Sequence, residues 1–484
     1  MTLGELFDAA VLPPHTGDVT VSGLAIDSRA VKPGDLFAAL PGVKAHGWQF
    51  AEAAAAKGAA AILTETGKTG LKIPVIAVDD PALALAHAAA RFYPRQPETI
   101  AAVTGTNGKS STVDFLRQIW TRASIDGASL GTLGVARGEG RIETGYTTPD
   151  AIALHQALDA LTGQGVTHLA MEASSHGLKQ RRMHAVKVTL TGFTNLTQDH
   201  LDYHPDFSDY FASKRLLFSR LAEKGSPSVI NVDSEWGDKI AEAARAAGLD
   251  VITVGWRGRD WQIREITPRP ASQQIVLSVG GRTHRVELPL VGEFQTANAV
   301  GAAALAASSG VDEKEAIAAI NHLTGVPGRL EEAARTRSGS PVLVDYAHTP
   351  DGLDKLLRAA RPHTKGRIIL VFGCGGDRDP TKRDRMGAIA VDLADEVIVT
   401  DDNPRSEDPA DIRKSILRGA RGATEIGDRA EAIRAGVAML KPGDALVLAG
   451  KGHETGQKVG EVVHPFDDRE EARRAISEHE GNHD

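Results

Sequence analysis

The chain has a single cysteine, Cys374, among 484 residues. One cysteine cannot form an intramolecular disulfide, and nothing in the sequence indicates an oxidising compartment. The first residues, MTLGELFDAA, lack the basic segment followed by an apolar one that marks a signal peptide. No uninterrupted apolar run approaches the ~18 residues that a membrane helix needs. These absences predict a cytoplasmic protein without membrane insertion.

An excess of positive charge is also absent. The formal net charge is -8, so we expect no nucleic-acid partner, although a local basic pocket is compatible with this charge. Hydrophobic residues make up 42% and charged residues 24%, which is typical of a globular protein. We find no short internal repeat and no low-complexity tail beyond the last few polar residues.

Two joints rich in proline and glycine divide the chain. The first is YPRQP at 93–97, and the second is TGVPGR at 324–329, followed by a polar stretch that ends at Pro341. Such clusters between periodic segments are typical of linkers and loops. Because the chain is too long for one ordinary core, we expect three domains, at 1–96, 97–330 and 331–484.

The run TGTNGKSS at 104–111 carries the strongest chemical signal. An apolar run at 99–103 predicts a strand before it, and a helical pattern begins at Lys109. A strand, a glycine turn, Lys-Ser and a helix can form a cradle for phosphate groups, with Lys109 supplying charge and Ser110 a Mg²⁺ ligand. Val103 stands where the usual GxxxxGK[ST] pattern has glycine. An ordinary strand-to-helix turn that happens to contain a lysine is therefore an alternative interpretation.

Blocks two and three alternate strand-like with helical runs, which predicts mostly parallel sheets covered by helices on both faces. In block three, three apolar runs each lead into a polar loop that contains charged residues: 368–372 into GCGGDRD, 397–400 into DDNPRSEDP and 445–449 into GKGHETGQ. Parallel strands would bring these loops to one sheet edge, where ligands bind in such folds. Block one contains DSRAVKPGDLFAALPGVKAHGWQF at 27–50, to which sequence physics assigns no chemistry.

Polar residues also follow two strand-like runs of block two. Glu172 comes after 169–171, and Asn195, Asp199, His200 and His204 come after 188–193. If these strands flank the phosphate-loop strand, Glu172 and His200 could hold a divalent ion shared with phosphate oxygens. A helix cap or ion pair for Glu172, and solvated loop positions for the histidines, are the alternatives.

Lys214 lies in DYFASKRLLF, which predicts a helix with Phe211, Leu217 and Phe218 facing inward. From the pattern alone, Lys214 is interpreted as a surface lysine. Asp345 and His348, in VDYAHTP, follow another strand; Asp345 could reach the phosphates or simply cap the turn.

These stretches, in this order, resemble the Mur ligases, ATP-dependent enzymes that add amino acids to the UDP-linked peptidoglycan precursor. The resemblance covers nearly the whole chain. The matching stretches are TGTNGKSS, MEASSHGL, FTNLTQDHLDYH, FASKRLLF, GEFQTANA, GVPGRLE and VDYAHTPDGL. It implies an α/β fold of three domains: a small N-terminal UDP-binding domain, a central P-loop-type ATPase domain and a C-terminal Rossmann-like doubly wound domain.

The resemblance also implies roles for single residues. Catalysis would fall to Lys109, Lys214, Glu172 and His200. ATP would be held by Gly105, Thr106, Asn107, Gly108, Lys109, Ser110, Ser111, Asn298, Arg329, Asp345 and His348. Mg²⁺ would be held by Ser110, Glu172, His200 and a carbamylated Lys214. The UDP-linked precursor would be bound by Ile26, Ser28, Thr147, Thr148, Ser174, Gln180 and Arg182.

The loop DDNPR, with GCGGDRD before it and GKGHE after it, resembles the family members that add meso-2,6-diaminopimelate rather than L-lysine. The implied amino-acid site is Arg383, Asp402, Asn403, Pro404, Arg405, Gly450 and Glu454. Two arginines suit the distal carboxylate, which lysine lacks, and two carboxylates suit the ammonium. Because PTKRDRM lacks the proline that many relatives have after Lys-Arg, Arg385 is an alternative to Arg383.

The implied reaction joins diaminopimelate to the D-Glu γ-carboxylate of UDP-N-acetylmuramoyl-L-Ala-D-Glu through an acyl phosphate, with ATP and Mg²⁺. Its partners would be these small molecules, and the protein would be a monomer. A lysine-adding ligase and a folylpolyglutamate synthetase are the alternative enzymes. A nucleotide-gated binding protein without ligase activity is a third possibility, which a second metal site would disfavour.

Overall fold

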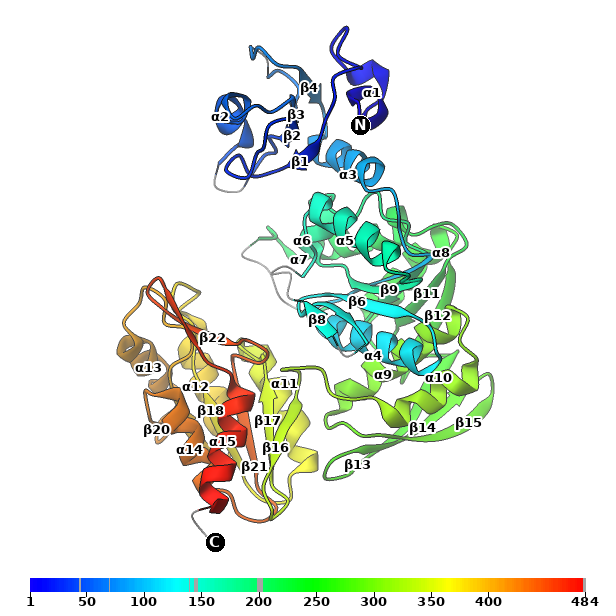
Figure 1. The fold of residues 1–484 in the computed structure, drawn as a ribbon. Coiled ribbons are helices and arrows are strands. Elements are labelled where there is room, and N and C mark those ends of the chain that lie inside the picture. Colours follow the sequence, from blue (N-terminus) through cyan, green and yellow to red (C-terminus); the bar gives the residue numbers. More distant parts are fainter. Residues whose placement is uncertain (43–44, 69, 139, 143–146, 198–202, 482–484) are drawn as a thin grey trace. The chain divides into compact units, whose positions relative to one another are not determined.

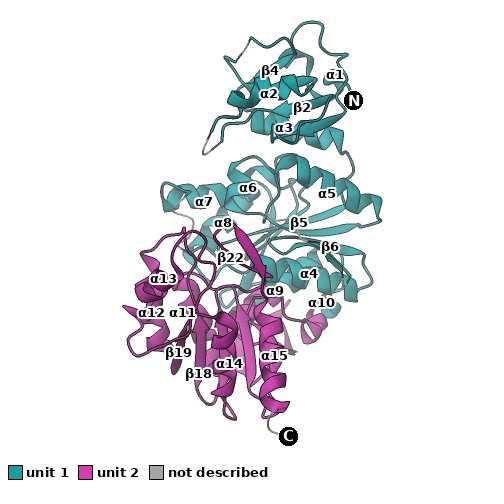
Figure 2. Cartoon of the chain, turned by 60° about the vertical axis from the view of Figure 1, so that its left-hand side comes forward, with its two compact units in different colours: residues 1–262, 301–316 teal, residues 263–300, 317–484 magenta. Residues whose placement is uncertain are grey.

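The computed structural model describes residues 1–484 except 43–44, 69, 139, 143–146, 198–202 and 482–484. The chain forms two compact units, which Figure 2 distinguishes by colour. Unit 1 comprises residues 1–262 and 301–316, and unit 2 comprises residues 263–300 and 317–484. The three-domain boundaries at 96 and 330 are a finer division and stay a prediction. Within the described residues, no helix has the length and apolarity to span a bilayer.

The N-terminal part is a four-stranded parallel sheet in the order β1-β2-β3-β4 (Figure 1). Helix α3 begins after Asp80, whose side chain accepts from the backbone N–H of Leu83, and Pro81 occupies the first turn, where it is well tolerated. The elements are α1 (Leu3–Leu6), β1 (Gly23–Ala25), β2 (Asp35–Ala38), α2 (Ala51–Ala56), β3 (Ala61–Glu65), β4 (Val75–Val78) and α3 (Pro81–Phe92).

The central sheet has eleven strands in the order β15-β14-β13-β12-β11-β10-β5-β9-β6-β7-β8. Strand β5 runs parallel to β10 on one side and β9 on the other, so the expected neighbours of the phosphate-loop strand are confirmed. Antiparallel pairs lie at both ends of the sheet. The strands are β5 (Thr99–Thr104), β6 (Gly127–Gly131), β7 (Gly134–Arg137), β8 (Gly140–Ile142), β9 (His168–Glu172), β10 (Leu190–Phe193), β11 (Pro227–Asn231), β12 (Asp250–Gly255), β13 (Trp261–Pro268), β14 (Gln273–Val279) and β15 (Arg282–Leu288).

Helix α4 begins at Lys109, as the apolar spacing predicts, and it buries Val113, Leu116, Ile119 and Trp120. The strand, turn and helix around TGTNGKSS are therefore confirmed. The helices along this part of the chain are α4 (Lys109–Arg122), α5 (Ala151–Gly163), α6 (Ser175–Lys179), α7 (Phe207–Leu216), α8 (Glu235–Ala246), α9 (Glu293–Ser308) and α10 (Glu313–Ala319).

The C-terminal sheet has six strands in the order β16-β17-β21-β18-β19-β20, parallel from β17 to β20. Alternate residues of each strand face opposite sides: Ile368 and Leu370 pack with α11, α12 and α13, whereas Ile369 and Val371 pack with α14 and α15. The doubly wound fold is therefore confirmed. The elements are β16 (Glu331–Arg335), β17 (Pro341–Asp345), α11 (Pro350–Ala360), β18 (Ile368–Phe372), α12 (Lys382–Leu393), β19 (Glu396–Val399), α13 (Pro409–Leu417), β20 (Thr424–Glu425), α14 (Arg429–Ala438), β21 (Ala445–Ala449), β22 (Gly456–Val459), β23 (Val462–Pro465) and α15 (Asp468–Gly481).

A buried histidine on α5 makes the stability of the fold depend on pH. His155 is fully buried, and neither ring nitrogen has a hydrogen-bond partner in the described part of the chain. Burial, with a smaller contribution from His87, lowers the pKa of His155 to about 4. The unfolded chain binds this proton near pH 6.5, so acid favours unfolding between about pH 6.5 and 4.

We expect His155→Leu to weaken this acid sensitivity. Between pH 7 and pH 5, the wild type should lose about 2 kcal/mol more unfolding free energy than the variant, because only the wild type carries the histidine that the unfolded chain protonates. Urea denaturation at the two pH values measures the difference. Equal losses for both proteins would contradict the account.

Candidate active site

The loop between β5 and α4 is held by the chain that follows β10. The backbone N–H of Thr106 donates to the Asn195 carbonyl at 2.9 Å, and that of Asn107 donates to Asn195 Oδ1 at 3.0 Å. A Cβ on Gly105 would lie 1.9 Å from Thr194 Oγ1, and Gly105 has a φ of 155°, so glycine is needed there. The loop is thus tightly fixed at the carboxyl edge of the sheet.

Two lysines donate to the carbonyl groups of this loop. Lys109 Nζ donates to the carbonyls of Gly105 and Thr106 at 2.9 and 2.8 Å. Lys214 Nζ, from α7, donates to the Gly105 carbonyl at 2.7 Å. Both cations therefore lie at the loop that would bind the phosphate groups of a nucleotide, where positive charge is favourable.

The interpretation of Lys214 as a surface lysine is wrong, because only 1% of the residue is exposed. Its ammonium lies 4.5 Å from the centre of the Tyr210 ring, on the same helix. The Tyr210 hydroxyl is 3.1 Å from Thr106 Oγ1, so α7 contacts the phosphate loop through a second side chain. The helix itself is confirmed, with Leu217 and Phe218 buried just after it and Phe211 half-buried.

Glu172 is buried at the end of β9 and contacts the start of α4. Ser110 Oγ donates to Glu172 Oε1 at 2.8 Å, and the backbone N–H of Thr132 donates to the same oxygen at 2.8 Å. A Cβ on Gly131 would lie 2.2 Å from that oxygen, so this close approach needs glycine. Carboxylate and hydroxyl oxygens are the ligands that Mg²⁺ prefers, so this pair fits the predicted metal. Sequence reasoning missed Thr132.

The rest of the predicted metal set is only partly described. His200, together with Asp199, lies outside the described residues. Within the described part of the chain, no group of three His, Cys, Asp or Glu side chains could hold a metal ion. The predicted set relies on a serine and a modified lysine instead, and it stays a prediction.

His204 is fully buried, so the alternative of a solvated loop position is wrong for this residue. Its Nδ1 lies 2.5 Å from Asp209 Oδ2, and its Nε2 lies 3.0 Å from Ser175 Oγ. Ser175 is the first residue of α6, directly after Ser174. His204 therefore ties α6 to α7, the helix that carries Lys214.

Five of the residues predicted to bind the UDP-linked precursor lie beside Glu172. Thr148 Oγ1 donates to the Glu172 carbonyl at 2.9 Å and accepts from the Ser174 N–H at 3.1 Å. Arg182 Nη1 donates to the Thr148 carbonyl at 2.6 Å, and Arg182 Nη2 donates to Gln180 Oε1 at 2.6 Å. The fifth, Thr147, reaches this group through the Thr132 hydroxyl at 2.9 Å.

The remaining two residues predicted for the precursor, Ile26 and Ser28, follow β1 in the N-terminal sheet. Ile26 is 40% exposed. The Ser28 carbonyl accepts from Lys57 Nζ at 2.9 Å. An exposed apolar side chain at the end of a strand is compatible with ligand binding, and their assignment stays a prediction.

Three of the four ATP-site residues predicted in unit 2 lie near one another. Asn298 Nδ2 donates to Gln295 Oε1 at 3.3 Å, and Gln295 Nε2 donates to the Arg329 carbonyl at 3.0 Å. Asp345 accepts from the backbone N–H groups of Leu330 and Ala347, at 2.7 and 2.8 Å. Asp345 therefore caps the turn, which is one of the two roles that the sequence allowed for it. Burial raises the pKa of the Asp345 carboxyl.

The fourth residue, His348, lies on the turn after β17. His348 Nδ1 is 2.8 Å from the Tyr346 carbonyl oxygen, and the guanidinium of Arg329 lies 5.0 Å from the centre of the Tyr346 ring. Lys382 Nζ donates to the His348 carbonyl at 2.6 Å. This turn is thereby linked to Arg329 and to the start of α12.

The loops after β18, β19 and β21 meet at one edge of the C-terminal sheet, where the sequence predicts an amino-acid site. Asn403 Nδ2 donates to Glu454 Oε2 at 2.8 Å, which links two of these loops. Arg405 Nη1 donates to the Gly376 carbonyl at 2.6 Å, which links the third. A Cβ on Gly376 would lie 1.9 Å from the Pro404 carbonyl oxygen, so glycine is needed at this contact. Arg405 has a φ of 53°. Non-glycine residues with positive φ concentrate at functional sites.

Arg383 and Arg385 differ in burial. Arg383 is 4% exposed, donates to Glu407 Oε1 at 2.9 Å and has its Nε without a hydrogen-bond partner in the described part of the chain. Arg385 is exposed. This geometry favours Arg383 for a buried carboxylate, and sequence reasoning missed Glu407.

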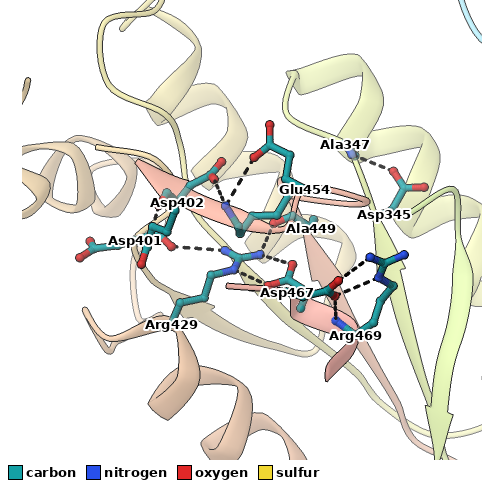
Figure 3. A network of polar contacts seen from close by, with 12 residues as sticks. Asp345, Ala347, Asp401, Asp402, Arg429, Ala449, Glu454, Asp467 and Arg469 are labelled. Atoms are coloured by element: carbon teal, nitrogen blue, oxygen red, sulfur yellow. Dashed lines mark hydrogen bonds and ion pairs between the residues drawn. The ribbon is translucent and has the colours of Figure 1, made fainter. Parts of the chain in front are cut away.

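A buried ion pair supports the same loops from inside the domain. Arg429 and Asp468 are both fully buried, with Nη2 and Oδ2 2.7 Å apart. Arg429 also donates to the carbonyls of Ala449 at 3.1 Å and Asp401 at 3.4 Å, as Figure 3 shows. These carbonyls directly precede Gly450 and Asp402. Gly450 has a φ of 115°, and a Cβ there would lie 3.1 Å from Asp402 Oδ2.

Comparison with known proteins places all three parts of the chain. Residues 20–93 match the model described as Mur ligase family, catalytic domain. Residues 103–306 match the Mur ligase middle domain, and residues 328–452 match the Mur ligase, glutamate ligase domain.

Full-length relatives carry a specific name. A UDP-N-acetylmuramoyl-L-alanyl-D-glutamate--2,6-diaminopimelate ligase from Chelativorans sp. (strain BNC1) is 52% identical over 481 residues, which cover 99% of each chain. A ligase of the same name from Caulobacter vibrioides is 50% identical and covers 98% of each chain.

Solved structures agree on the fold. One of an enzyme with the same name has a TM-score of 0.73 at 33% identity and covers 100% of this chain and 99% of its own. A MurF ligase from Thermotoga maritima in complex with ADP has a TM-score of 0.64 at 16% identity, covers 96% and 99%, and shows the fold alone. The chain belongs to the Mur ligase family.

Proposed function

We propose that this protein is the ATP-dependent ligase that joins meso-2,6-diaminopimelate to the D-Glu γ-carboxylate of UDP-N-acetylmuramoyl-L-Ala-D-Glu. The observation that carries the proposal is the identity of about half, over nearly the whole chain, with relatives named for this reaction. The loops after β18, β19 and β21 support it, because they bring arginine, asparagine and carboxylate side chains to one sheet edge.

The reaction divides into two balanced steps. An oxygen of the γ-carboxylate attacks the γ-phosphorus of ATP, the bond from that phosphorus to the bridging oxygen breaks, and ADP leaves. The amine of diaminopimelate then attacks the acyl carbon and loses a proton. The bond from carbon to the phosphate oxygen breaks, which releases inorganic phosphate that carries one former carboxylate oxygen.

The chain would contribute mainly positioning and positive charge. The loop 105–111 would hold the phosphate groups, with the Lys109 ammonium on their negative charge. Ser110 and Glu172, with His200 and a carbamylated Lys214, would hold Mg²⁺, which neutralises phosphate charge when bound. Thr148, Ser174 and Arg182 would orient the precursor beside Glu172, close to the same loop.

Selection of diaminopimelate over lysine would depend on its distal carboxylate. Arg405 and Arg383 would bind that carboxylate, and Asp402 and Glu454 would accept from the distal ammonium. Lysine lacks the carboxylate, so the guanidinium donors that are not already bonded to Glu407 and the Gly376 carbonyl would have no ligand acceptor, and such a mismatch discriminates strongly. We further propose that the enzyme acts as a monomer in the cytoplasm, on these small molecules alone.

Phosphate release by the purified protein tests the function. The assay contains ATP, Mg²⁺ and the UDP-linked dipeptide precursor, with meso-diaminopimelate or L-lysine added in parallel. We expect release with diaminopimelate and at least about 10³-fold lower kcat/KM with lysine, because the arginines would face an empty site. Equal release with lysine would overturn the specificity. Release with neither amino acid would overturn the proposed substrate and favour another substrate of the superfamily.

A further inference from the structure

Lys451 is a buried cation in the loop that follows β21, and it is not among the residues predicted for the amino-acid site. None of its surface is exposed. Its Nζ donates to the Gly456 carbonyl at 2.6 Å and lies 3.4 Å from both Asn403 Oδ1 and Glu454 Oε2. Asp402 Oδ1 is 3.8 Å away. Burying an ammonium group is costly unless acceptors and negative charges surround it, and these four oxygens do so.

The position of Lys451 matters because Asp402 and Glu454 come from different loops. Figure 3 shows their side chains converging from the segments after β19 and β21. Two carboxylates brought to one place repel each other, and a cation between them turns the repulsion into attraction. Lys451 thereby holds the two loops in one arrangement, together with the bond from Asn403 to Glu454.

Glu454 keeps accepting capacity on the side away from Lys451. The Glu454 side chain is 31% exposed, so it can reach a ligand that Lys451, with no exposed surface, cannot touch. Asp402 Oδ1, which lies 3.8 Å from Lys451 Nζ, is buried and has no hydrogen-bond partner in the described part of the chain. A buried acceptor without a donor carries an energetic cost that an ammonium donor would remove.

We propose that Lys451 is a positioning residue for the amino-acid substrate, which fixes Glu454, beside Asp402, as an acceptor for the distal ammonium of diaminopimelate. The inference rests on the proposed function. Lys451 acts through Glu454 and does not itself contact the substrate. A merely structural lysine would change stability without changing the KM for one substrate selectively.

The test is a double-mutant cycle of Lys451→Gln and Glu454→Gln in the full chain, with KM measured for diaminopimelate and for ATP. Each single variant should raise the KM for diaminopimelate about tenfold and leave the KM for ATP within about twofold. The double variant should have the same KM for diaminopimelate as Glu454→Gln alone, because Lys451 has no effect once Glu454 is neutral.

Lys458→Gln is the matched control, since Lys458 lies in the adjacent strand and its side chain pairs with the exposed Glu461 at 3.8 Å. It should keep the wild-type KM for diaminopimelate. An unchanged KM in Lys451→Gln, or a double variant whose KM rises by the product of the single effects, would overturn the inference.

Folding of the variants is checked by thermal melting. If Lys451→Gln fails to fold, the double variant removes both charges together and remains informative. Its KM should still equal that of Glu454→Gln, and a further tenfold rise would overturn the inference. Absence of diaminopimelate-dependent phosphate release in the wild type would instead overturn the proposed function, on which the inference rests.

Discussion

Lys109→Met is expected to lower kcat for phosphate release at least about 10³-fold, because the Lys109 ammonium would stabilise the negative charge that spreads over the transferred phosphoryl group. The structure places this ammonium at the phosphate loop, where it donates to the carbonyls of Gly105 and Thr106. Methionine keeps the length and apolar stem of the side chain and removes only the charge. Steady-state phosphate release with all substrates saturating measures the loss.

Thermal melting serves as the control for this variant. Lys109 is half-buried, and its side chain donates to the Gly105 and Thr106 carbonyls of the adjacent loop, so the melting temperature should change little. A folded Lys109→Met protein with a kcat within tenfold of the wild type would show that the loop does not handle the γ-phosphate.

Lys214→Ala should lower kcat by a similar factor, at least about 10³-fold. The substitution removes a group that would neutralise phosphate charge or, as a carbamate, help to hold Mg²⁺. The side chain is buried against the phosphate loop and lies over the Tyr210 ring. We expect the loss to appear in kcat for phosphate release, while the fold is kept.

Lys239→Ala is the matched control, since Lys239 also lies over an aromatic ring, that of Trp236 at 4.0 Å, but is 46% exposed. Its activity should equal that of the wild type. The carbamate is tested separately by ¹³C spectroscopy in labelled bicarbonate: the wild type should give a carbamate signal that Lys214→Ala lacks. Wild-type turnover by Lys214→Ala would contradict any role at the phosphates.

The phosphate loop could be predicted from the sequence because its signal is local. The run before it is apolar, and β5 is buried there. The helical spacing predicts that the helix begins at Lys109, which is the first residue of α4. The carboxyl-edge loops of the C-terminal sheet could be predicted in the same way, since β18 and β21 occupy the predicted residues and β19 nearly so. Parallel pairing of β9 with β5 places Glu172 opposite Val103, and Ser110 at the start of α4 then donates to Glu172.

The buried cations could not be predicted from local patterns. An isolated lysine in a helical pattern indicates an exposed side chain, yet Lys214 is buried because α7 packs on a loop 109 residues earlier. Arg429 finds its partner Asp468 across 39 residues, and Lys451 finds Asn403 across 48. Only tertiary packing brings these charges together. For Lys214, resemblance to a family supplied what periodicity did not.

Oxygen transfer tests the central claim most directly. The UDP-linked dipeptide is prepared with ¹⁸O in the D-Glu γ-carboxylate and turned over with ATP, Mg²⁺ and diaminopimelate, and the released phosphate is examined by mass spectrometry. An acyl-phosphate ligase should place one ¹⁸O in each phosphate formed. Phosphate without ¹⁸O, released while the tripeptide forms, would contradict the account.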